Sequence, residues 1–252
     1  MDKLQKVLLL SLISTSAVTW YLSRDQPDMM MAMMTYDPKA FSLFTLSWTA
    51  GMAAMMFPAI SPMVLLYNRL IKTGNGETIG IEKSYPLKMT LFVGCYLAVW
   101  ALTGVTLLLL WSLPMNSFLM EIGRNQLTII YGIILIIAGA YQFTPLKTKC
   151  LGYCESPMSF FMRRWRSGTI GAIKMGTFHG IYCLGCCWPY FLLMVALGWM
   201  NLLWMGLFAG IIFGEKVWSR GILVARTAGI GFIVLGLIAL LVPNAHTLLR
   251  II

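Results

Sequence analysis

Long apolar runs, separated by short polar or basic connections, set the pattern of this chain. A helix rises about 1.5 Å per residue, so an apolar run of about 20 residues is long enough to cross a hydrocarbon core about 30 Å thick. The alternation typical of an outer-membrane barrel is absent. The pattern therefore predicts an all-α, polytopic transmembrane helical bundle with about seven spans. The predicted spans cover residues 4–22, 41–67, 87–113, 126–143, 168–197, 202–214 and 222–242.

The first apolar run, residues 4–22, has two interpretations. The sequence around Ser16 is compatible with signal-peptide cleavage, which would remove this segment from the mature protein. Trp20 and Tyr21 are instead typical of the aromatic belt at the membrane interface of a helix that is retained. We expect a retained anchor.

Composition agrees with a membrane location, since 59% of the residues are hydrophobic and only 11% are charged. A soluble domain of this size is less apolar. We expect one integral membrane domain over residues 1–252, as a multi-pass protein of the inner or plasma membrane. Residues 1–40 hold the first span and an outer methionine-rich loop, and residues 41–252 form the core.

The positive charges predict an orientation. With seven spans and the N-terminus inside, fifteen of the nineteen Lys and Arg residues fall on the inner side. Cytoplasmic segments of membrane proteins carry such an excess, so we expect the N-terminus inside and the C-terminus outside. This distribution accounts for the net charge of +10 without a nucleic-acid partner. The partner predicted instead is the lipid bilayer.

The fifth predicted span contains an unusual cluster of a histidine and three cysteines. On a helix, His179, Cys183, Cys186 and Cys187 fall within an arc of roughly 100°, and so share one face. Soft sulfur ligands and an imidazole suit Cu(I) first and Zn(II) second. The same thiols suit redox chemistry. The alternative is that each cysteine is a small buried hydrophobe.

The second predicted span carries a methionine stripe next to two prolines. Met52, Met55 and Met56 share one helix face, and their thioethers are soft metal ligands. Pro58 and Pro62 each remove a backbone hydrogen bond within the span, as occurs where a neighbouring helix or a cavity satisfies the freed carbonyl. The alternative is a kinked helix in which the methionines only pack.

Two further groups of sulfur-containing residues lie between spans. Five methionines occur within residues 29–34, which form either an apolar lip at the membrane interface or a loop that captures Cu(I). Cys150 and Cys154 lie in the long basic loop that we predict for residues 144–166. Their spacing allows a chelate or a dithiol pair, but no second pair follows at zinc-ribbon spacing.

The same basic loop ends in a cluster of cations around an aromatic residue. Arg163, Arg164 and Arg166 flank Trp165. Arginine and tryptophan together are typical of an interfacial anchor close to anionic lipid.

The predicted orientation arranges the sulfur ligands by depth. Residues 29–34 lie outside, the methionines of the second span lie near the middle, and the cysteines lie from the middle to the inner side. Thioethers bind metal without losing a proton, whereas thiolates need a reducing compartment, which the cytoplasm supplies. The order suits a path for Cu(I).

Three ordered motifs carry a resemblance to a known family. They are W-x3-M-x2-MM-x-P-x3-P from Trp48, YQ-x-TPLK-x2-CL-x2-C-x2-P from Tyr141, and HG-x-YCLGCCW from His179, followed by MN-x3-M from Met200 and EK at Glu215. On these motifs the chain resembles a prokaryotic family of predicted metal-binding integral membrane proteins with a domain of unknown function. The resemblance implies a membrane protein that binds metal. It covers roughly residues 48–216 and does not extend to residues 29–34 or to the first span.

Three functions compete at this point. The first is a Cu(I)-binding membrane protein that transports copper or delivers it to a membrane copper enzyme. The second is a structural or assembly subunit of a larger complex, such as a copper-dependent oxidase or monooxygenase. The third is a membrane thiol–disulfide oxidoreductase, in which the cysteines of the fifth span exchange electrons with Cys150 and Cys154.

Other classes of activity find little support in the sequence. No Ser-His-Asp order, P-loop or pair of carboxylates points to hydrolysis or to an ATP-driven pump. We therefore expect no catalytic activity of the chain's own. The metal ligands that we predict are His179, Cys183, Cys186, Cys187, Met52, Met55, Met56, Cys150 and Cys154.

Overall fold

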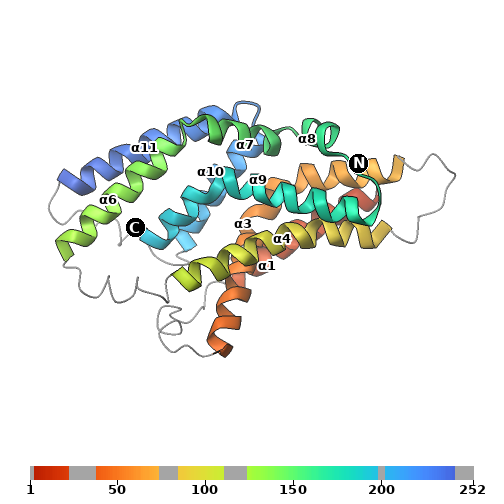
Figure 1. Cartoon of the computed structure of the whole chain (residues 1–252), viewed down its shortest axis with the longest axis horizontal. Coiled ribbons are helices and arrows are strands. Elements are labelled where there is room, and N and C mark those ends of the chain that lie inside the picture. Colours follow the sequence, from red (N-terminus) through yellow and green to blue (C-terminus); the bar gives the residue numbers. More distant parts are fainter. Residues whose placement is uncertain (1–2, 23–37, 74–84, 111–123, 198–201, 242–252) are drawn as a thin grey trace.

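A computed structural model describes residues 3–22, 38–73, 85–110, 124–197 and 202–241, and in these residues all regular structure is helical (Figure 1). The all-α fold class is therefore confirmed for the described part of the chain. The helices are α1 (Lys3–Leu22), α3 (Pro38–Thr73), α4 (Tyr85–Leu110), α6 (Arg124–Tyr141), α7 (Pro145–Glu155), α8 (Pro157–Arg164), α9 (Gly168–Leu197), α10 (Leu202–Val217) and α11 (Gly221–Leu241).

Helices α6 and α11 pack side by side at one end of the molecule, on the left in Figure 1. Glycines allow their backbones to approach closely. A Cβ atom at Gly139 would lie 2.6 Å from the carbonyl oxygen of Gly229, and one at Gly236 would lie 2.7 Å from that of Gly132. Small residues at helix contacts are a common device for close packing within membranes.

The other half is built around α4, α9 and α3. Helix α9 packs along α4, and a Cβ atom at Gly176 would collide with the backbone of Phe92. Helix α3 packs against α4 and α10, and α1 packs against α3, where the Ser16 hydroxyl donates to the carbonyl of Ala54. The core between these helices is rich in buried aromatic rings and sulfur atoms.

The prediction of a loop over residues 144–166 is wrong, because most of this segment forms α7 and α8. Thr144 caps the N-terminus of α7: its side chain accepts a hydrogen bond from the Lys147 backbone N–H at 3.2 Å, and Pro145 occupies the first turn. Both are ordinary helix-start signals. The charges of this segment predicted a loop, but they lie on short helices.

The predicted count of seven spans is also too high for the described residues. Three helices are long and apolar enough to cross a membrane, or up to four if one pair bent by 63° forms a single span. The three are Phe41–Lys72, Tyr85–Leu110 and Gly221–Leu241, and the bent pair is Thr128–Tyr141 with Pro145–Glu155.

The shortfall has a physical reason. Helix α10 has only 16 residues, and the apolar part of α1, Lys6–Tyr21, is shorter than a typical span. Helix α9 has 30 residues, but polar and aromatic side chains such as His179 and Tyr182 lower its apolar character. Residues 29–34, the outer methionine loop of the prediction, lie outside the described residues.

Candidate metal centre

A buried group of sulfur atoms lies where α3, α7 and α9 meet. It consists of Met56, Cys154, Cys183, Cys186 and Cys187, and we call it the sulfur cluster. Cys154 is 6% exposed and the other four are fully buried. All four cysteines have free thiols. The cluster therefore gathers soft ligands from three helices, away from solvent.

Cys186 lies between two other thiols of the cluster. Its Sγ is 3.3 Å from the Sγ of Cys187 and 3.8 Å from the Sγ of Cys154. Its thiol also donates to the carbonyl of Cys183 at 3.2 Å, as a helical residue three positions later can. Helix α9 thus presents adjacent thiols to a thiol of α7.

Cys183 contacts a buried cation. The Nζ of Lys216 on α10 is 2.9 Å from the Cys183 Sγ and 3.7 Å from the Met56 Sδ. The Tyr96 hydroxyl is 3.1 Å from the same Cys183 sulfur, and Met56 lies 3.9 Å from it. The Cys183 sulfur is therefore surrounded by an ammonium, a hydroxyl and a thioether.

A buried ion pair lies directly behind the cluster. The Nζ of Lys147 is 2.7 Å from the Glu215 carboxylate, and both side chains are fully buried. The same ammonium donates to the carbonyl of Cys186 at 2.8 Å, and the Tyr190 hydroxyl donates to Glu215. These bonds fix α7 and α10 to the turn of α9 that carries Cys186.

His179 lies one helical turn before Cys183, inside a box of aromatic rings. Its ring stacks on Tyr96 with centroids 5.3 Å apart, and Phe160 approaches edge-on at 5.6 Å. The side chain is buried, and neither ring nitrogen has a hydrogen-bond partner in the described structure. A buried polar group is normally satisfied, so this imidazole has unused capacity for a ligand.

The remaining predicted ligands are buried but lie apart from the cluster contacts. Met52 and Met55 lie on α3 in the same core, without a hydrogen-bond-length contact to a cysteine among the described residues. Cys150 is on α7, and its sulfur lies against Gly185, where a Cβ atom would be only 2.9 Å away.

In the described part of the chain, no three His, Cys, Asp or Glu side chains are already arranged around one point as a metal site. The cluster contains thiols and a thioether, which fit a soft metal in chemistry. Its present contacts are between sulfur atoms and to Lys216.

The sequence analysis missed Lys147, Glu215, Lys216 and Tyr96 as parts of this site. It counted the two lysines among the cytoplasmic cations, whereas the structure buries both in the core. A signal was present, because charged residues inside or at the end of an apolar run are expensive to bury and are commonly functional.

Comparison with known proteins identifies a family for this chain. The sequence model of a family described as PpoB2, copper chaperone, matches residues 45–239, more than half of the chain. This range contains the whole sulfur cluster, His179 and the buried lysines. No curated protein and no solved structure matches the chain.

Proposed function

The chain belongs to the PpoB2 copper chaperone family, and from this premise we propose that it holds Cu(I) at the sulfur cluster and delivers it to a copper-dependent membrane enzyme. The observation that carries the proposal is the burial of four free thiols and a thioether in one core. Cys186 lies 3.3 Å from Cys187 and 3.8 Å from Cys154, and Cys183 lies 3.9 Å from Met56, measured between sulfur atoms. A chaperone needs ligands that bind Cu(I) tightly yet exchange it, and thiolates and thioethers do so.

The cluster favours Cu(I) over Zn(II) for two reasons. A structural Zn(II) site normally takes four ligands in a tetrahedron, whereas these cysteines include an adjacent pair, Cys186 and Cys187, that does not easily reach one ion in that geometry. Lys216 also contributes a positive charge beside Cys183. Repulsion from this charge is greater for a divalent than for a monovalent ion.

His179 and the methionines of α3 have a supporting role in the proposal. The free nitrogens of His179 lie one turn along α9 from Cys183, so the imidazole is placed to receive copper before or after the thiols. Met56 contacts Cys183. Met52 and Met55 are buried on the same helix, α3. The proposal assigns these side chains to the path by which Cu(I) reaches the cluster.

The proposed setting is the cell membrane. Helices α3, α4 and α11 are long and apolar enough to span it, and their exposed side chains include many leucines and isoleucines. We propose that the N-terminus of the bundle lies on the inner side of the membrane. A thiol cluster near the inner side is then kept reduced.

Elemental analysis of the detergent-purified chain under reducing conditions tests the proposal. We expect about one copper per wild-type chain and little zinc. The Cys183→Ser, Cys187→Ser double variant loses the copper, because a hydroxyl is a hard and weak ligand for Cu(I). The matched control is Cys95→Ser, which removes a partly exposed thiol on α4 that lies outside the cluster.

A second variant separates ligation by His179 from packing. His179→Phe fits the aromatic box and removes two buried unsatisfied nitrogens, so thermal stability is kept or raised. If His179 serves the copper path, the copper affinity or the loading rate of this variant falls by tenfold or more. Unchanged affinity and rate assign His179 to packing alone.

The competing functions give other outcomes. Absence of copper from the wild-type chain, together with a partner at fixed stoichiometry, overturns the proposal and leaves an assembly subunit. Thiol–disulfide exchange is favoured by one distance, the 3.8 Å between the sulfurs of Cys154 and Cys186. An oxidoreductase function predicts that the number of free thiols falls when the purified chain is mixed with a quinone or a disulfide substrate.

A further inference from the structure

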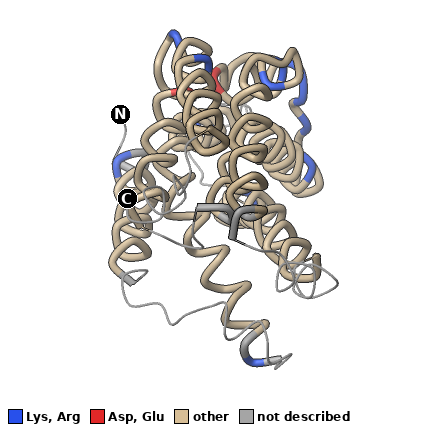
Figure 2. Tube along the Cα trace, turned by 90° about the vertical axis from the view of Figure 1, so that its left-hand side faces the viewer, with Lys and Arg blue, Asp and Glu red and all other residues tan. Residues whose placement is uncertain are grey.

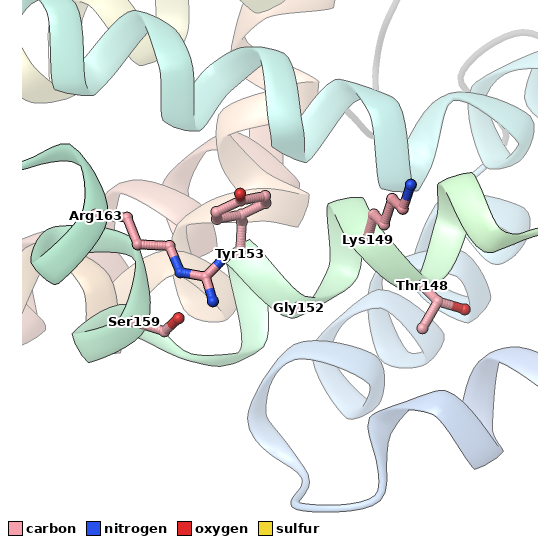
Figure 3. A pocket seen from close by; sticks show the side chains of 6 residues that line it. All are labelled: Thr148, Lys149, Gly152, Tyr153, Ser159 and Arg163. Atoms are coloured by element: carbon pink, nitrogen blue, oxygen red, sulfur yellow. The ribbon is translucent and has the colours of Figure 1, made fainter.

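The bend between α7 and α8 contains an open hollow of about 490 Å³, far along the chain from the sulfur cluster residues of α9. Figure 3 shows Arg163 and Ser159 of α8 facing Gly152 and Tyr153 of α7 across the bend. The residues that line the hollow are Thr148, Lys149, Gly152, Tyr153, Ser159 and Arg163.

The hollow is basic and rich in hydroxyl groups. Lys149 and Arg163 are exposed, and neither makes an ion pair with a carboxylate of the described residues. Ser159 and Tyr153 add hydroxyls that donate hydrogen bonds, and a Cβ atom at Gly152 would meet only open space. The Thr148 hydroxyl, in contrast, donates to the Thr144 carbonyl at 3.3 Å. Two cations and several donors around an open concavity are the groups that bind a phosphate.

The wall of the hollow is fixed by neighbouring contacts. The ring of Tyr153 stacks on Tyr182 of α9 with centroids 4.3 Å apart. The hydroxyl of Tyr182 accepts a hydrogen bond from Arg164 at 3.0 Å, and Arg164 also lies over the ring of Phe178. Arg164 is therefore engaged in the fold, while Arg163 remains available to the hollow.

A second basic hollow of about 260 Å³ continues from the first and shares Arg163 with it. Figure 2 shows most of the Lys and Arg segments gathered at the upper end of the molecule, where α7 and α8 lie in Figure 1. Other residues lining the second hollow are Arg164, Trp165, Arg166, Lys174 and Phe178. The positive charge thus extends beyond a single phosphate-sized site.

Apolar side chains are exposed next to these cations. Met158 is 53% exposed, Met162 is 79% exposed, and Trp165 is 41% exposed, while Phe160 and Phe161 anchor α8 in the core. A free phosphate ion would not cover these apolar side chains. A phospholipid would, because its acyl chains can cover the methionines while its phosphate binds the arginines.

From these observations we propose that the hollow between α7 and α8 binds the phosphate headgroup of an anionic phospholipid. Arg163 pairs with the phosphate, Ser159 donates a hydrogen bond to it, Lys149 supplies a second positive charge at the other end of the hollow, and the acyl chains lie along the exposed side of α8. The site holds the thiol-bearing α7 against the membrane surface. This assignment does not depend on copper binding.

Native mass spectrometry of the full-length chain in detergent tests the assignment. We expect adducts with phosphatidylglycerol to be at least fivefold more abundant than those with phosphatidylcholine at equal concentration. In the Lys149→Gln, Arg163→Gln double variant this preference falls to near unity. The matched control is the Arg220→Gln, Arg226→Gln double variant, which removes two cations outside both hollows. We expect it to keep the preference for phosphatidylglycerol.

Inorganic phosphate distinguishes the sources of the ligand. If millimolar inorganic phosphate abolishes the phosphatidylglycerol adducts in the wild type, the site is one for free phosphate and the lipid assignment is overturned. Equal adducts with both lipids overturn it as well. Copper content measured on the same samples keeps the two proposals apart, because we expect it to be unchanged in the double variant.

Discussion

Lys216 brings a positive charge to within 2.9 Å of the Cys183 sulfur, inside a core that water does not reach. An ammonium at this distance offsets part of the cost of burying negative charge at the Cys183 sulfur. Replacing Lys216 with leucine removes the charge without adding a sulfur ligand. The metal selectivity of the cluster then changes, because Zn(II) carries one charge more than Cu(I).

We predict that Lys216→Leu raises the affinity for Zn(II) relative to Cu(I) by more than tenfold. Two unit charges about 4 Å apart interact by about 4 kcal/mol at an effective dielectric constant of about 20, and about 1.4 kcal/mol corresponds to tenfold. Competition against chelators of known affinity measures the ratio. Lys216→Arg keeps the charge and serves as the control. The same ratio in Lys216→Leu and wild type would remove Lys216 from the selectivity argument.

At the scale of single residues, the sequence predicted part of the candidate site. The helical spacing of His179, Cys183, Cys186 and Cys187 predicted that they share one helix face. In the structure all four lie on α9 and are buried. The partners of this face could not be predicted, because Lys216 and Met56 are 33 and 127 residues away from Cys183 along the chain. That these residues bind metal remains a prediction.

Glycines on both helices set the distance between α6 and α11. We predict that Gly139→Ala lowers the stability of the protein by about 1–3 kcal/mol, as overpacking of a tight contact does, because the new Cβ atom would lie 2.6 Å from the carbonyl oxygen of Gly229. Gly231→Ala on α11 meets open space. This control gains helix propensity and is neutral or stabilising. Thermal unfolding in detergent measures both, and a loss of stability in both variants would contradict the argument.

At the scale of elements, the apolar pattern located most helices and missed two. The run predicted for residues 168–197 coincides with α9, and those of α1, α4, α6, α10 and α11 agree within a few residues. Helices α7 and α8 were predicted as a loop, because charge was given more weight than the start signal of Thr144 and Pro145. The count of spans was too high because a run long enough for a helix, such as α10, can still be too short for a membrane.

The orientation of the whole molecule is a prediction that rests on charge alone. We expect a cysteine introduced at Asn75 to react with a membrane-impermeant maleimide only after the cells are opened, and one at Asn116 to react in intact cells. The reason is the excess of Lys and Arg on the predicted inner side, which persists when the buried Lys147 and Lys216 are left out. The reverse pattern of labelling would place the N-terminus outside. The cysteines of the cluster are buried, and the partly exposed Cys95 is replaced with serine so that the background does not react.

The position of the sulfur cluster also has a mechanical consequence for the whole molecule. Cys154 belongs to α7, which follows α6, whereas the other three thiols belong to α9, which packs along α4. A metal ion bound by both sides would therefore cross-link two halves of the molecule, and the loaded protein would resist heat more than the empty one. A recipient protein that drew α7 aside would remove a single thiolate and leave three. Copper would then be handed over ligand by ligand, without passing through solvent as a bare ion.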